Sequence, residues 1–228
     1  MNMSIHRQQM SRLLTGFFLL GEMILYVLIL TTGGKLLVYS SFFAIVLCFL
    51  YALSGIKTGH PLLIIGLLFT VLADFCLVVC VPIEQLWGMV FFLVTQTCYA
   101  LFLNQALPNR NFQLLRMALV LSGIVLCFLV LRDKTDLLAL ISVCYYVNLI
   151  LNALHAFCQR KQNKLFPAAL VLFILCDTVV GLQVASNRYL PIQEGSLLHR
   201  ILFVGFNLSW LFYLPSQVLI ALSAHRNH

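Results

Sequence analysis

Two aspartates stand inside apolar runs, about a hundred residues apart. Asp74 lies near the middle of the run 66–79, and Asp177 lies within the run 172–179. A carboxyl group inside the hydrocarbon of a membrane costs at least ~2.5–3.5 kcal/mol on insertion scales, so such a residue usually has a function. Paired carboxyl groups suit acid–base chemistry, in which one group donates a proton and the other stabilises a cation. The sequence therefore predicts a functional site at Asp74 and Asp177.

The composition indicates the environment in which this pair works. The chain has 228 residues, of which 62% are hydrophobic and 9% charged, and its mean hydropathy is +1.00. A soluble domain has about 45–50% apolar and about 25% charged residues. We therefore expect a multi-pass integral protein of a bacterial inner membrane or a plasma membrane. The net charge of +7 is spread over the segments between apolar runs, which indicates contact with lipid headgroups and no nucleic-acid partner.

The apolar runs predict an all-α bundle of membrane-spanning helices that forms one domain over residues 1–228. A span needs about 20 mainly apolar residues. Eight runs meet this requirement: 12–32, 36–53, 61–81, 86–107, 114–131, 136–158, 165–187 and 197–222. Because the connections are short, neighbouring helices should be antiparallel.

The distribution of Lys and Arg predicts that both termini are cytoplasmic. Cytoplasmic segments of membrane proteins are enriched in these residues. Nine lie on the side of the termini and five on the other side. The nine are Arg7, Arg12, Lys57, Arg110, Arg116, Arg160, Lys161, Lys164 and Arg226; the five are Lys35, Arg132, Lys134, Arg188 and Arg200.

Further polar residues are expected at the depth of the aspartates. At ~1.5 Å per residue, Glu22, Asp74 and Asp177 lie about 15–20 Å from the inner ends of their helices. Other polar side chains fall at a similar depth or share a helix face with one that does, so they are candidates for substrate contact. The candidate substrate-binding residues are Glu22, Gln96, Tyr99, Asn148, Tyr213 and Gln217. Hydrogen bonds between helices are the alternative explanation for them.

A weak internal similarity accompanies this pattern. Phe69 precedes Asp74, and Phe173 precedes Asp177, on spans that lie four helices apart. This arrangement suggests a parallel four-plus-four duplication of about 12–107 and 114–222. The histidines are not spaced as metal ligands at the depth of the acids, and no serine-nucleophile motif is present, so we expect neither a metal nor another cofactor.

Four stretches resemble the YhhN family of membrane proteins, which includes the transmembrane lysoplasmalogenases. They are residues 68–74, 88–99, 172–177 and 213–220. The chain keeps both aspartates of the family pattern, together with Tyr99, Tyr213 and Gln217. It departs from the pattern at four positions, where Thr70, Ala73, Gln96 and Cys176 replace a serine, a glycine, a histidine and a serine.

The resemblance implies hydrolysis of the vinyl-ether bond of lysoplasmalogens, with a lysophospholipid substrate and surrounding membrane lipids as partners. Asp74 and Asp177 would then act as the acid and base, since protonation of the double bond creates an oxocarbenium-like cation that water attacks. Buried acids also suit a proton-coupled transporter, a lipid-binding protein or a scaffold with structural acids. The sequence does not indicate an oligomeric state.

Overall fold

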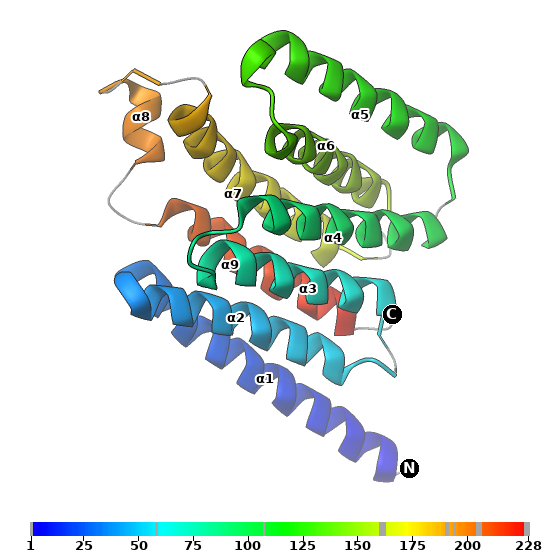
Figure 1. Ribbon diagram of the computed structural model, residues 1–228. Coiled ribbons are helices and arrows are strands. Elements are labelled where there is room, and N and C mark those ends of the chain that lie inside the picture. Colours follow the sequence, from blue (N-terminus) through cyan, green and yellow to red (C-terminus); the bar gives the residue numbers. More distant parts are fainter. Residues whose placement is uncertain are drawn as a thin grey trace.

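The computed structural model is a bundle of helices that run alongside one another (Figure 1). It describes residues 2–57, 59–106, 108–159, 163–189, 192–193, 195–203 and 207–225, with side chains from residue 9 onward. Of the residues in the charge count above, Arg7, Arg160, Lys161 and Arg226 lie outside the described side chains. The described elements are α1 (Asn2–Thr31), α2 (Gly34–Ser54), α3 (Pro61–Asp74), the π-helix η1 (Phe75–Val79), α4 (Gln85–Ala106), α5 (Arg110–Leu131), the 3₁₀-helix η2 (Arg132–Lys134), α6 (Leu137–Cys158), α7 (Leu165–Arg188), α8 (Leu197–Leu202) and α9 (Leu208–His225).

The predicted all-α class is confirmed, and the described segments contain seven helices that are long and apolar enough to cross a membrane. Local signals account for several of their ends. Asn109 caps α5 by accepting the N–H of Phe112 at 3.1 Å, and Asp136 caps α6 by accepting the N–H of Ala139 at 2.8 Å. Pro61 starts α3. The N–H groups of the first helical turn have no partner within the helix, so a proline at this position loses no hydrogen bond.

Two predicted spans have different boundaries in the structure. The span 61–81 is α-helical only as far as Asp74 and continues as η1, whose wider turns end at Val79. The span 114–131 begins earlier, at Arg110, because the cap formed by Asn109 starts the helix there. Arg116, which the predicted span already contained, lies inside α5 and is buried.

The last predicted span, 197–222, is not one continuous helix. It comprises α8, which ends at Leu202, and α9, which starts at Leu208. Asn207 precedes α9 outside the helix, and asparagine is a residue type favoured at that position. The amide of Asn207 also donates to the carbonyl of Ile29 in α1, at 3.4 Å. The number of eight spans and the cytoplasmic termini stay predictions.

The helices form a layered bundle with α1 at one edge and α5 at the other (Figure 1). Between them, α3 packs on α4, α4 on α6 and α7 on α9. Gly66 permits the close approach of α3 and α4, because a Cβ there would lie 2.4 Å from Cε1 of Tyr99. The hydroxyls of Thr70 and Thr95 both donate to the carbonyl of Gly66, at 3.1 and 3.2 Å. This packing fixes α3 and α4 beside each other just before Asp74.

Candidate functional site

A cavity of about 480 Å³ lies between α3 with η1, α4, α5, α6, α7 and α9. Its volume is within the ~300–1,000 Å³ that is usual for small-molecule sites. Most of the lining side chains are apolar. Asp74 and Asp177 both face this space, and so do Tyr145 and Tyr213. The two aspartates therefore share one cavity.

Asp74 is the last residue of α3, at the junction where the α-helix changes to the π-helix η1. Segments of π-helix inside longer helices occur frequently at functional sites. The Asp74 side chain is buried, and its Oδ2 accepts a hydrogen bond of 2.7 Å from the hydroxyl of Tyr213 in α9. The packing of Leu77 against Gly88 holds η1 on α4, since a Cβ at Gly88 would lie 2.5 Å from Leu77 Cγ.

Asp177 lies in α7 and has the same kind of partner. The hydroxyl of Tyr145 in α6 donates to its Oδ2. The rings of Tyr145 and Tyr213 both pack on Phe92 of α4, with ring centroids 5.6 and 6.4 Å apart. One aromatic side chain thus supports both tyrosines, and each tyrosine orients one aspartate. The arrangement presents two carboxyl groups to an apolar space.

The structure places the other candidate substrate-binding residues away from the cavity wall. Glu22 of α1 is buried and accepts a hydrogen bond of 3.3 Å from the thiol of Cys48. Gln217 is buried in α9, and its amide donates to the hydroxyl of Ser216 at 3.1 Å. Tyr99 is fully buried against α3. Their roles in substrate contact stay predictions, while Tyr213 is the member of the set that lines the cavity.

Gln96 and Asn148 belong to a separate buried cluster around Arg116. The guanidinium of Arg116 donates to Oδ1 of Asn148 at 2.9 Å and to Oδ1 of Asn152 at 2.8 Å. The amide of Asn152 donates in turn to the Gln96 side chain at 3.0 Å. The cluster joins α4, α5 and α6. Gln96 occupies the position at which the family pattern has a histidine. It lies outside the cavity wall.

Two contributors to the site were missed by the sequence-based prediction. Tyr145 precedes Asn148 by three residues on α6, and this shared helix face was an available signal for it. Phe92 had no such signal, because one phenylalanine among many apolar residues is not distinctive. Within the described ranges, no three His, Cys, Asp or Glu side chains are grouped as metal ligands.

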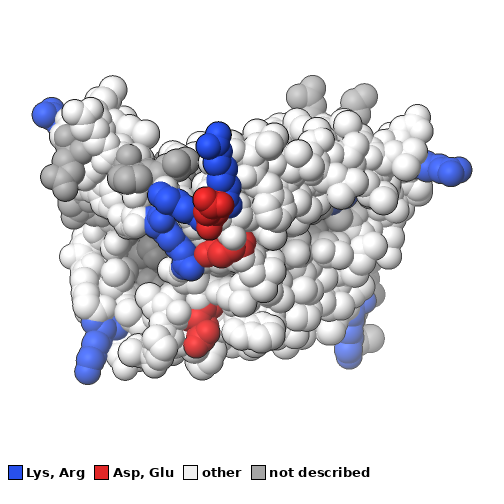
Figure 2. All heavy atoms as spheres, turned by 45° about the horizontal axis from the view of Figure 1, so that its top comes forward, with Lys and Arg blue, Asp and Glu red and all other residues white. Residues whose placement is uncertain are grey.

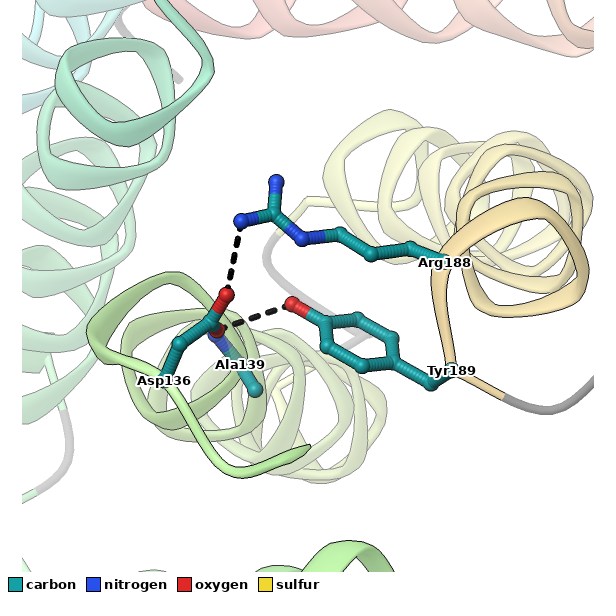
Figure 3. A network of polar contacts seen from close by, with 4 residues as sticks. All are labelled: Asp136, Ala139, Arg188 and Tyr189. Carbon is teal, nitrogen blue, oxygen red and sulfur yellow. Dashed lines mark hydrogen bonds and ion pairs between the residues drawn. The ribbon is translucent and has the colours of Figure 1, made fainter. Parts of the chain in front are cut away.

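A network of polar contacts surrounds Asp136 at one end of the cavity. Figure 3 shows the carboxylate of Asp136 between Arg188, Tyr189 and the backbone N–H of Ala139. The Arg188 guanidinium lies 2.8 Å from Oδ2 of Asp136, and the Tyr189 hydroxyl donates to Oδ1 at 2.8 Å. Lys134 Nζ donates to the backbone carbonyl of Tyr189 at 2.9 Å. Ala139 and Tyr189 line the cavity, so these charges adjoin it.

The hydrogen bonds at Asp136 determine its ionisation. Partial burial by itself raises the pKa of this carboxyl, but the Ala139 N–H, the Tyr189 hydroxyl and the Arg188 charge outweigh burial and lower the pKa below its usual value. Burial and the bond to Asp136 raise the pKa of Tyr189 to about 12. At neutral pH, Asp136 is therefore ionised and Tyr189 keeps the proton that it donates.

The charged side chains are distributed unevenly over the surface. Figure 2 shows acidic and basic side chains crowded together on one face, with other basic side chains scattered at the margins and mostly uncharged surface between them. Such uncharged surface is expected on a protein that faces lipid.

A comparison with protein-family models matches residues 37–224 to the YhhN family. The match extends from α2 to α9 and includes both aspartates. The comparisons with curated proteins and with solved structures found no match.

Proposed function

The chain belongs to the YhhN family, and from this premise we propose that it is a membrane-embedded hydrolase of lysoplasmalogen-type lysophospholipids. The enzyme would cleave the vinyl-ether bond and release a fatty aldehyde and a glycerophospho-alcohol. The observation that carries the proposal is that Asp74 and Asp177 line one cavity, each with a tyrosine hydroxyl donating to its Oδ2.

The reaction needs two carboxyl groups in different states. A protonated carboxyl group donates its proton to the double-bond carbon remote from the ether oxygen, which leaves an oxocarbenium-like cation. An ionised carboxylate stabilises that cation and takes a proton from the attacking water. The water oxygen bonds to the carbon attached to the ether oxygen and forms a hemiacetal. Its collapse breaks the bond to the glycerol oxygen, which takes up a proton, and gives the aldehyde and the alcohol.

The two tyrosines are consistent with one carboxyl group acting as the proton donor and the other as the ionised carboxylate. Each hydroxyl donates to Oδ2 of its aspartate, and Oδ1 would transfer the proton or face the cation. The apolar wall limits the amount of water near the cation, and a low local dielectric strengthens its attraction to a carboxylate. The reaction requires no cofactor.

The departures from the family pattern leave this geometry in place. Thr70 bonds to Gly66 of its own helix, and Gln96 bonds to Asn152 outside the cavity wall. Cys176 does line the cavity, next to Asp177 in the sequence. The carboxyl pair therefore does not depend on the replaced histidine.

The test is aldehyde release from a lysoplasmalogen by the purified protein and its variants. We expect Asp74→Asn and Asp177→Asn each to lower kcat by at least ~100-fold, because general acid–base catalysis typically contributes ~10²–10⁴-fold. Asp133→Asn, which changes an exposed acid of η2, is the matched control and should retain activity. Full activity in either cavity variant would remove that aspartate from the mechanism.

A proton-coupled transporter or lipid-binding protein is the second candidate, and the interrupted helices favour it. Transporter sites are often formed by discontinuous helices. Here η1 follows Asp74, Pro215 lies inside α9 two residues after Tyr213, and α8 is separate from α9. Proton-linked lipid flux into liposomes without aldehyde formation would support the transporter, whereas turnover would support the hydrolase.

A further inference from the structure

The cavity extends from the aspartates to one end of the bundle. Its wall there includes Ile83 and Gln85 before and at the start of α4, Ala139 near the start of α6, and Tyr189 after α7. Ile83 is exposed. Arg188 follows Asp177 by eleven positions in α7, which corresponds to about 16 Å or three helical turns. A ligand held at this end would therefore extend along the cavity toward the aspartates.

This end of the cavity carries opposite charges on different segments. Lys134 and Arg188 lie beside Tyr189, on the side formed by η2, α6 and α7. Glu84 is exposed and lies between Ile83 and Gln85, which both line the cavity. The rim, defined here as Glu84, Lys134 and Arg188, thus places two cations and one carboxylate around an apolar entrance.

The Arg188 guanidinium is available to a ligand. Its side chain is 50% exposed, and the described bond to Asp136 uses only one of its terminal nitrogens. An exposed ion pair contributes only about 0–1 kcal/mol, so an incoming anion can compete with Asp136. The planar guanidinium also binds phosphate oxygens through two parallel hydrogen bonds. A phosphate is the anion that this geometry suits best.

We propose that the rim binds the headgroup of the lipid substrate, with Lys134 and Arg188 on the phosphate and Glu84 on a positively charged amine. The substrate is then a single-chain phospholipid with both groups, and it enters through the end of the bundle formed by the η1–α4 and α5–α6 connections and the end of α7. Its glycerol lies between the rim and the aspartates, which hold the vinyl-ether bond at the start of the chain. This inference rests on the proposed hydrolysis, and it assigns residues to substrate selection.

The kinetic test compares a lysoplasmalogen with a phosphoethanolamine headgroup and one with a phosphoglycerol headgroup. Arg188→Gln and Lys134→Gln should raise KM about three- to tenfold for both lipids and leave kcat unchanged. Glu84→Gln should raise KM only for the amine-bearing lipid. An equal effect of Glu84→Gln on both lipids, or a fall in kcat at constant KM, would overturn the assignment. Lys35→Gln, at the start of α2 and outside the cavity wall, is the control for general attraction to lipid.

A matched pair separates phosphate binding from a structural role of the ion pair. Arg188→Gln and Asp136→Asn break the same salt bridge, and asparagine keeps the cap of α6. A headgroup site predicts that Arg188→Gln raises KM, whereas Asp136→Asn leaves KM unchanged or lowers it, because Arg188 is then free for phosphate. Equal increases in KM would assign the ion pair to structure alone and would overturn the proposal.

A binding measurement keeps this inference separate from the hydrolysis. The probe is a saturated alkyl-ether lysophosphoethanolamine, which has no vinyl-ether bond to cleave, and the readout is the shift in Tm of the purified full chain. The probe should stabilise the wild type more than Arg188→Gln, even if no lipid is hydrolysed. Inorganic phosphate alone should give a smaller shift, and an equal shift would indicate a free-anion site instead. Equal stabilisation of the wild type and Arg188→Gln by the lipid would refute the rim site whatever the activity.

Discussion

At the scale of residues, each aspartate is oriented by one phenolic hydroxyl. Tyr213 bonds to Asp74 and Tyr145 bonds to Asp177, although the four residues come from four different helices. In an apolar wall such donors restrict the rotation of the carboxyl group and stabilise a negative charge on it. The tyrosines are therefore expected to affect the reaction without reacting themselves.

Removing either hydroxyl should slow turnover more than it weakens binding. Hydrogen bonds to charged groups contribute about 1.5–3 kcal/mol, and 1.36 kcal/mol corresponds to tenfold in rate. Tyr145→Phe and Tyr213→Phe should thus each lower kcat by about ten- to a hundredfold in the aldehyde-release assay. Tyr39→Phe, on the exposed side of α2, should not change kcat. Wild-type kcat in both cavity variants would show that the hydroxyls do not orient the carboxyl groups.

Residue types and spacing indicated the two aspartates and Tyr213, which line the cavity, but did not group the remaining polar residues. Depth along a helix follows from counting residues, so a common layer could be expected from the sequence. The direction of a side chain depends on how its helix is rotated in the bundle, which counting does not provide. Gln96 and Asn148 therefore fall at the expected depth but turn toward Arg116. Arg116 itself lay within the predicted span 114–131, but it was counted only as a basic residue on the inner side of the bundle.

At the scale of elements, the N-terminus of α6 connects the rim to the fold. Asp136 accepts the N–H of Ala139, the Tyr189 hydroxyl and the Arg188 guanidinium, so one carboxylate caps α6 and ties it to the end of α7 (Figure 3). Asp136→Ala removes all three bonds, whereas Asp136→Asn retains an amide oxygen that can cap. The two substitutions should therefore differ in stability.

Loss of an N-cap costs about 0.5–2 kcal/mol, so Asp136→Ala should lower the free energy of unfolding by about that amount at pH 7. The folded state depresses the pKa of Asp136, so the ionised carboxylate stabilises the protein above its unfolded pKa of ~3.9. That contribution is lost as the pH falls through the lower folded value. Thermal unfolding in detergent should show that Asp136→Ala has a lower free energy of unfolding than the wild type. The difference should be full at neutral pH and should shrink below pH ~4. A difference of constant size down to pH 3 would exclude the carboxylate as its source.

At the scale of the whole molecule, the apolar runs predicted most of the helices, because a span must satisfy its backbone internally and be apolar over its length. The apolar runs could not reveal the change from α3 to η1 or the separation of α8 from α9. The residues of η1 are as apolar as those of α3, so the change to wider turns after Asp74 leaves no mark in the hydropathy. The break between α8 and α9 is preceded by an amphipathic-looking segment that carries His199 and Arg200. η1 contributes directly to the cavity wall.

The direction of the whole bundle in the membrane decides which leaflet supplies the substrate. The rim lies at the end of the bundle opposite to the start of α3 and the end of α9. The count of nine to five basic residues predicts that this end faces away from the cytoplasm. A green fluorescent protein fused after His228 should therefore fluoresce in intact cells, because it folds in the cytoplasm. Alkaline phosphatase, which folds only outside the cytoplasm, should be active when inserted after Asp133 and inactive when fused after His228. The reverse pattern would place the rim at the cytoplasmic leaflet, and the substrate would then have to come from the inner half of the membrane.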